Sequence, residues 1–297
     1  MINRRTSAVI VAALTASLSG AYAQQDFSKV EIKTTRLTDT LYMLEGEGGN
    51  IGVSTGADGV YLIDDQYAPL SEKILAAVKA ISNKPIRFVI NTHWHGDHVG
   101  GNENIGKTGA TIMAHEAVRA RMASGGVLAA FNMTVPPAAP AALPVITFKD
   151  GLTLHLNGEN AKLLHVEPAH TDGDTLVHWP TANVIHTGDF FVSGRFPFID
   201  MSSGGTLDGT IKAAGIVIGL ANGQTKIIPG HGPLASKADV VKYRDMLVDA
   251  RKRAAAAKSA GKTAEEFVAA KPYADLDELG QGFIKTGMFA RMMFDAL

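Results

Sequence analysis

The stretch Ile86-Arg-Phe-Val-Ile-Asn-Thr-His-Trp-His-Gly-Asp-His-Val-Gly-Gly101 joins an apolar run to four potential metal ligands within six residues, namely His93, His95, Asp97 and His98. The apolar run predicts a buried strand. Because alternate residues of extended backbone share a face, His93 and His95 leave the end of this strand on the same side. We therefore expect these two imidazoles to share one metal ion.

Gly96 follows the two histidines, and glycine permits a sharp turn of the chain. Such a turn would bring Asp97 and His98 back toward the same point from the other side, which predicts a second ion beside the first. A lone histidine is more often a hydrogen-bonded residue than a ligand. Three imidazoles packed beside a carboxylate without a cation would require a costly desolvation of polar groups, so a purely structural cluster is disfavoured.

The composition of the chain is typical of a folded, globular protein. Its 297 residues are 46% hydrophobic and 19% charged, so the chain can bury a large core. The formal net charge of -1 and the lack of a long basic run argue against a nucleic-acid partner held through phosphate neutralisation. The chain has no cysteine, so it has no disulfide, and any metal must be held by nitrogen and oxygen ligands.

Residues 1–23 have the features of a signal peptide. A positively charged start precedes an apolar run from Ala8 to Leu18, and the small-x-small pattern Ala21-Tyr-Ala23 follows it. The apolar run is shorter than the about 20 residues that a membrane crossing needs, so we expect cleavage and no membrane attachment afterwards. The residues after Arg4-Arg5 are not the bulky apolar ones of a twin-arginine signal, which favours ordinary secretion. The mature protein is therefore expected to be periplasmic or secreted.

Strands and helices are expected to alternate along the mature chain. Short apolar runs separated by Gly-rich turns from Val30 to Asp65 predict a meander of strands. Apolar residues at helical spacing predict a helix from Leu70 to Ile81, which leads into the strand before the histidines. The segment 135–144 contains four prolines, which predicts an exposed loop or a semi-rigid lid. Further strands are expected at 109–114, near Ile146, and at 152–156, 162–166, 175–179, 184–186 and 226–228, with helices at 116–123 and 207–220.

The C-terminal part, from Ser236 onward, is expected to be helical. Residues 238–257 are amphipathic, and Thr263-Ala-Glu-Glu266 matches a capping box that opens another helix. The stripe of Phe and Met from Phe283 to Phe294 indicates helix packing rather than a substrate pocket. No long polar linker divides the chain, so residues 24–297 are predicted to form one domain with a helical C-terminal extension at about 236–297. Strands and helices in both halves predict two packed sheets with helices outside.

Three more candidate ligands stand where a predicted strand gives way to a loop. His170 lies in Pro168-Ala-His-Thr-Asp-Gly-Asp174, Asp189 lies in His186-Thr-Gly-Asp-Phe190, and His231 lies in Ile227-Ile-Pro-Gly-His-Gly-Pro233. Strand ends converge on one rim of a sheet, and such rigid edges hold a metal geometry well. We expect these side chains to complete the site.

With these motifs in this order, the sequence resembles the metallo-β-lactamase superfamily from about Leu41 to His231. The resemblance implies an α+β fold, a four-layer αββα sandwich with a dinuclear centre at its open edge. Such nitrogen and oxygen sites suit two zinc ions per chain, although iron or manganese would also fit. The resemblance implies that the first ion is held by His93, His95 and His170, the second by Asp97, His98 and His231, and that Asp189 bridges them.

Departures from individual branches of the family narrow the substrate class. The lactamase subclasses with a cysteine ligand are excluded, and the flavin-linked diiron reductases have Glu where this chain has His95. The remaining lactamase subclass shares the His-x-His-x-Asp-His string, but Asp189 as a bridge is more similar to glyoxalase II and the lactonases. The substrate therefore stays open.

We hypothesise that the chain is a dinuclear zinc hydrolase that opens a cyclic amide or ester, with β-lactams as the first compounds to test. A water shared by two ions has a pKa lowered toward about 7, and the resulting hydroxide would attack an acyl carbonyl. Asp97 would be both a ligand and the group that orients this hydroxide. The alternatives are a lactonase, a glyoxalase II-like thioesterase, an RNA-processing relative, which the lack of basic residues disfavours, and a non-catalytic metal-binding or partner-binding protein.

Other polar residues have simpler explanations. Arg195 could meet a substrate carboxylate, but surface arginines are common and we assign it no role. His186 could orient Asp189 without itself binding the metal. Most of the other histidines are expected to be packed or hydrogen-bonded, namely His115, His155, His165 and His178.

Overall fold

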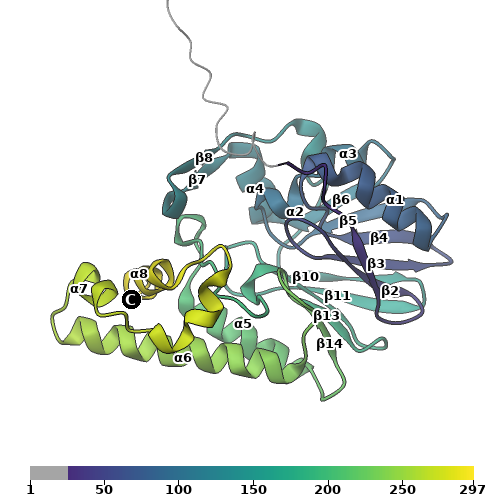
Figure 1. Cartoon of the computed structure of the whole chain (residues 1–297). Helices are drawn as coiled ribbons and strands as arrows, with labels where there is room; N and C mark the ends of the chain where they lie inside the picture. The colour runs from purple at the N-terminus through teal and green to yellow at the C-terminus, as the bar shows by residue number, and fades with distance from the viewer. Residues whose placement is uncertain (1–25) are drawn as a thin grey trace, which may run out of the picture.

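The computed structural model describes residues 26–297, so the predicted signal peptide lies outside the described residues. Two sheets pack face to face, and helices cover the outer face of each sheet (Figure 1). This arrangement confirms the predicted α+β class and the αββα sandwich. Every helix within residues 26–297 is too short or too polar to span a bilayer.

The first sheet has seven strands in the order β1-β2-β3-β4-β5-β6-β9. Its first four strands are antiparallel, which confirms the meander, and the strands from β4 to β9 are parallel. Strand β5 lies inside the sheet, where a continuous apolar run is typical because both faces are covered. The bounds are β1 Lys33–Arg36, β2 Leu41–Glu45, β3 Ile51–Gly56, β4 Gly59–Ile63, β5 Ile86–Asn91, β6 Thr111–His115 and β9 Ile146–Phe148.

The second sheet has five strands in the order β10-β11-β12-β13-β14. Apolar side chains of both sheets, among them Ile90 and Leu163, form the core between them. Trp179 Nε1 donates a hydrogen bond of 2.7 Å to the hydroxyl of Tyr61 across this core, so the one polar atom of the indole is satisfied. The bounds are β10 Gly151–Leu156, β11 Glu159–His165, β12 Thr175–Trp179, β13 Val184–His186 and β14 Lys226–Ile228.

Helices α1 and α3 pack on the outer face of the first sheet. On the outer side of the second sheet, α5, α6 and α8 share one hydrophobic cluster with residues of the sheet, and α8 packs against α6. The predicted helices at 70–81, 116–123 and 207–220 are confirmed to within one residue at each end. The bounds are α1 Ser71–Ile81, α2 Gly96–Val99, α3 Asn102–Gly106, α4 Glu116–Ser124, α5 Leu207–Leu220, α6 Lys237–Ser259, α7 Ala264–Ala269 and α8 Thr286–Asp295.

The start of α7 confirms the predicted capping box. The Thr263 hydroxyl accepts from the Glu266 amide at 3.2 Å, and the Glu266 carboxylate accepts from the Thr263 amide at 2.9 Å. Two amides that have no partner within the helix are satisfied in this way. Helix α6 begins with a second capping box, between Ser236 and Asp239, which was not predicted.

A small hairpin after α4 was also not predicted from the sequence. It consists of β7 (Gly126–Leu128), the single turn η2 (Ala129–Phe131) and β8 (Met133–Val135). Its apolar side chains pack against Trp94, which stands between the two histidines of the first motif. The Pro-rich segment 135–144 that follows has only one short turn, Pro140–Ala142, so the predicted loop is confirmed.

Candidate metal centre

The seven predicted ligands gather at one edge of the sandwich. His93 and His95 follow β5, and Asp97 and His98 lie in α2, directly after them. The other three follow strands of the second sheet, as the sequence predicted. His170 lies in the loop after β11, Asp189 lies in the turn η4 (Gly188–Phe190) after β13, and His231 comes after β14.

The turn between the two halves of the first motif forms differently from the prediction. Gly96 does not have a positive φ, and a Cβ at this position would meet nothing within 4 Å. The chain turns because residues 96–99 form the single helical turn α2, with His95 in extended conformation before it. The turn thus brings Asp97 and His98 back toward the centre, as expected, but it does not require glycine.

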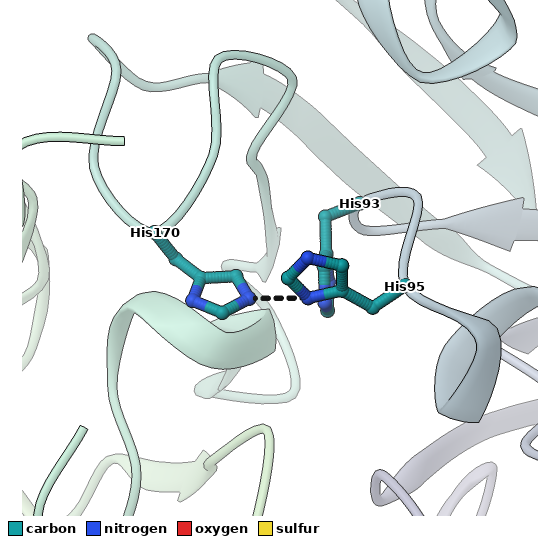
Figure 2. A group of neighbouring side chains, drawn as sticks. All are labelled: His93, His95 and His170. Carbon is teal, nitrogen blue, oxygen red and sulfur yellow. Dashed lines mark hydrogen bonds between the residues drawn. The ribbon is translucent and has the colours of Figure 1, made fainter. Parts of the chain in front are cut away.

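The first ligand group consists of three buried imidazoles that point toward one another (Figure 2). His170 Nε2 lies 2.9 Å from His95 Nδ1, and the ring of His93 is nearly perpendicular to both other rings. Among the described residues, His93 Nε2 is a buried nitrogen with no hydrogen-bond partner. Since an unpaired buried polar atom is costly, its position among two other imidazole nitrogens fits a metal ligand.

The second ligand group consists of Asp97, His98 and His231. His231 Nε2 lies 3.2 Å from Asp97 Oδ2 and 3.3 Å from His98 Nε2. The side chains of Asp97 and His231 are 23% and 21% exposed, whereas the three imidazoles of the first group are at most 8% exposed. The centre is therefore open to solvent on the side of the second group.

Asp189 lies between the two groups. Its Oδ2 is 3.3 Å from His231 Nε2 and 3.8 Å from His170 Nε2. Its Oδ1 is 3.1 Å from His98 Nε2 but outside hydrogen-bond geometry, so, like His93 Nε2, it is a buried ligand atom without a hydrogen-bond partner among the described residues. A carboxylate in this position can contact two cations at once, which fits the bridging role that the resemblance implies.

The electrostatics of the two groups differ. Burial and then the charge of His98 hold the pKa of His93 well below its ordinary value, so its imidazole is neutral and has a free lone pair. At His98 and His231 burial acts in the same direction, but the facing carboxylates, Asp189 foremost, outweigh it. They raise the pKa of His98 well above its ordinary value and that of His231 to about 9. A neutral imidazole at His93 and a field that favours positive charge in the second group fit a pair of cations.

In each imidazole of the motif that begins at His93, the ring nitrogen that does not face the other ligands has a partner. His98 Nδ1 donates to Asp64 Oδ2 at 2.8 Å, and His95 Nε2 donates to Asp200 Oδ2 at 3.0 Å. His93 Nδ1 is 3.0 Å from the Thr92 hydroxyl, which itself donates to Asp64. Such contacts fix the tautomer and the orientation of a ligand imidazole.

The loop that carries His170 is fixed in the same manner. Its Nδ1 donates to the carbonyl of Phe198 at 2.7 Å, and its backbone amide donates to Asp174 Oδ2 at 2.6 Å. Asp174 also accepts from the amide and the hydroxyl of Thr171. The carboxylate therefore holds the turn from 170 to 174 in shape.

Sequence reasoning missed Asp64, Asp174 and Asp200 as supports of the ligands. Asp174 belongs to a quoted motif, and Asp64 lies one residue before the end of the predicted meander, but the sequence assigned neither a partner. Asp200 had no sequence signal, because it meets His95 from 105 residues away. Only the folded chain brings these carboxylates to the imidazoles.

The remaining histidines and Arg195 lie outside the ligand groups. His186 bonds to the carbonyl of Asn50 and to the amide of Gly188, so it holds the turn before Asp189 rather than the Asp189 side chain. His115 and His165 stack on each other with centroids 3.9 Å apart. Arg195 is half-buried beside Gly282 of the C-terminal segment.

The chain is similar to known proteins. The metallo-beta-lactamase superfamily model matches residues 42–237. A beta-lactamase-like protein 2 homolog of Caenorhabditis elegans is 27% identical over 202 residues, 67% of this chain, which spans only 60% of that protein's length. The type 2 metallo-beta-lactamase of Bacteroides fragilis is 24% identical over 217 residues, 68% of this chain and 80% of that protein.

A solved structure, of a stereoselective inverting sec-alkylsulfatase from Pseudomonas sp., shares the fold. It has 17% sequence identity and a TM-score of 0.65, over 89% of this chain and 50% of that one. The family match covers about two thirds of the chain and contains all seven candidate ligands. By this match and by its fold, the chain belongs to the metallo-β-lactamase superfamily.

Proposed function

We propose that the chain is a dinuclear zinc hydrolase that cleaves the acyl bond of a cyclic amide or ester, with β-lactams as the first substrates to test. The observation that carries this proposal is Asp189, which lies between a group of three imidazoles and a group of two imidazoles and a carboxylate. We assign the first group, His93, His95 and His170, to one zinc ion, the second group, Asp97, His98 and His231, to the other, and Asp189 to both.

The donor set supports zinc as the metal. Zinc in hydrolytic sites is held by histidine nitrogens and carboxylate oxygens, and this chain offers both and no thiolate. Iron or manganese would also accept these ligands, so the metal content has to be measured. When bound, the pair of cations lowers the pKa of a bound water and polarises the substrate carbonyl.

Asp97 has the position of a proton carrier. Burial would raise its pKa, but the charges of His98 and His231 overcome this effect and lower it, so Asp97 is ionised at neutral pH. The carboxylate is partly exposed on the open side of the centre. It can accept a proton from the attacking water, whose oxygen bonds to the carbonyl carbon. It can then pass this proton to the leaving nitrogen or oxygen as the acyl bond breaks.

A lactone or thioester is the second candidate substrate. It is favoured by Asp189, whose two oxygens face both ligand groups, because a bridging aspartate resembles glyoxalase II and the lactonases more than the β-lactamases. A non-catalytic metal-binding protein is the alternative from another class. A turnover assay distinguishes this non-catalytic protein from the two kinds of enzyme.

The proposed compartment is the periplasm or the medium, on the strength of the N-terminal sequence pattern alone. Expression with the native N-terminus in a Gram-negative host should yield a periplasmic protein that begins at Gln24. An intact N-terminus in the cytoplasmic fraction would contradict export.

The test of the function is a turnover assay on protein of known metal content. The purified chain is loaded with zinc, its zinc is measured by elemental analysis, and chromogenic lactams, lactones and thioesters are offered at neutral pH. We expect two zinc ions per chain and turnover of at least one class. A chain that holds two zinc ions and hydrolyses none of these compounds contradicts the proposal.

Asp97→Asn is the matched variant, because the amide keeps the shape of the side chain and an oxygen for the metal but is a far weaker base. We expect kcat to fall roughly 10²- to 10⁴-fold while the zinc content is retained. Full turnover by a variant with both ions bound would exclude the proposed role of Asp97.

A further inference from the structure

We propose that Phe131 and Phe283 form an aromatic platform beside the candidate metal centre, which binds an aryl or long alkyl group of the substrate. This inference rests on the proposed function and adds to it the chemical class of the group next to the scissile bond. Phe283 lies outside the family match, which ends at residue 237. The C-terminal extension thus acquires a role in substrate recognition.

Three phenyl rings lead from the candidate ligands to the surface. The ring of Phe198 has its centroid 6.0 Å from that of His95 and 5.8 Å from that of His170. The ring of Phe131 lies 4.8 Å from Phe198, and that of Phe283 lies 4.8 Å from Phe131. All these distances lie within the range of about 4.5 to 7 Å at which aromatic rings interact. The rings therefore form a continuous apolar path that starts at the centre.

The exposure of these rings increases along the path. Phe198 and Phe131 are half-buried, whereas Phe283 is 72% exposed. A single exposed apolar side chain is common and needs no explanation. Phe283 differs because it extends a path from the ligands to solvent. The prediction of helix packing for the stripe 283–294 is confirmed for Phe289 and Phe294, which are buried, and is wrong for Phe283.

The backbone that carries Phe283 is fixed to the loop after Asp189. Phe283 lies between the turn η6 (Ala274–Gln281) and α8, and its neighbour Ile284 is buried. The amide of Phe196 donates to the carbonyl of Leu279 at 3.2 Å, and the ring of Phe196 stacks on Phe289 at 4.0 Å. The C-terminal extension therefore holds Phe283 in place relative to the centre.

The hairpin that carries Phe131 is tied to the centre from the other side. The amide of Ala129, in η2, donates to the Ser202 hydroxyl at 3.2 Å. Ser202 in turn donates to Asp200, which is the partner of His95. The hairpin and α8 lie at the same end of the sandwich in Figure 1, and the contact of the two rings joins them. Because both supports are fixed, little ordering cost accompanies the binding of an apolar group.

The test compares two substrates that share the scissile bond and the leaving group, one with a phenylacetyl and one with an acetyl side chain. We expect the zinc-loaded protein to prefer the phenylacetyl substrate in kcat/KM. In Phe283→Ala, kcat/KM for the phenylacetyl substrate should fall about tenfold, and that for the acetyl substrate should stay within about twofold. Phe283→Trp should retain the preference.

Val145→Ala is the control, because Val145 is also 72% exposed but lies next to the edge strand β9, outside the aromatic path. It should leave both substrates unaffected. An equal loss on both substrates in Phe283→Ala, or an unchanged ratio between them, would overturn the platform.

A binding measurement separates failure of the platform from failure of the proposed function. Phenylacetohydroxamate and acetohydroxamate chelate zinc in the same way and differ only in the phenyl group. By calorimetry, the zinc-loaded protein should bind the phenyl compound about tenfold more tightly, and Phe283→Ala should lose this difference. If no substrate is hydrolysed but the difference is found, the hydrolase proposal fails and the platform stands. Equal affinities in the unaltered protein would refute the platform whatever the turnover.

Discussion

Replacement of Asp200 by asparagine should weaken the zinc site of the three imidazoles and leave the other site nearly unchanged. Asp200 is 1% exposed, and its Oδ2 accepts from His95 Nε2 at 3.0 Å. In Asp200→Asn the amide oxygen can still accept from the Ser203 amide, so the local turn is kept. The amide nitrogen would then face a nitrogen of His95 that also donates. The imidazole loses its acceptor without a change in the volume of the side chain.

The size of the effect follows from this contact. A hydrogen bond to a charged group contributes about 1.5–3 kcal/mol. Removal of such a support from a ligand histidine typically lowers metal affinity about 10- to 100-fold, which corresponds to about 1.4–2.7 kcal/mol. The two figures agree, so we expect a loss of zinc affinity in this range at the site that contains His95.

The assay is a competitive zinc titration against a chromogenic chelator, which resolves two dissociation constants. Asp172→Asn is the control, since Asp172 is a nearby carboxylate whose partner is Arg121 rather than a ligand. It should leave both constants unchanged. Wild-type affinity at both sites in Asp200→Asn would refute the reasoning, and an equal loss at both sites would indicate general unfolding instead.

Three further outcomes are expected. Gly230→Ala should abolish turnover while the protein stays folded by circular dichroism, because the added Cβ would lie 1.9 Å from Asp189 Oδ1; retained activity would contradict the assigned position of Asp189. Removal of zinc by a chelator should lower the Tm, since each ion at 100 times its Kd stabilises the fold by about 2.7 kcal/mol; an unchanged Tm would contradict zinc binding. Burial and, after it, the charge of His165 lower the pKa of His115 in the folded chain. The neutral imidazole of His115 therefore stabilises the fold above its ordinary pKa of 6.5, and this stabilisation is lost as the pH falls through the lower pKa of the folded state. His115→Asn, which keeps an acceptor for the amide of Ala117, should therefore lose less stability in urea unfolding between pH 7.5 and pH 5 than the unaltered chain; equal losses would contradict this.

Local patterns predicted much of the secondary structure. Strands β12, β13 and β14 and helix α5 have the predicted bounds, because each is an apolar segment that a turn follows. The hairpin of β7 and β8 was missed, since strands of three residues are too short to show a period. It forms because its apolar side chains pack on Trp94, and that contact exists only in the folded chain.

The ligand types and the strand ends on which they stand could be predicted from the sequence, because metal ligation demands particular side chains and the strand pattern is local. The groups that support these ligands could not be predicted, because they come together only when the chain folds. Asp64 and Asp200 reach their imidazoles from 34 and 105 residues away, and Phe283 meets Phe131 across a still longer stretch of chain. Contacts of this kind depend on how sheets, loops and the C-terminal extension pack together. No local period in the sequence encodes that packing.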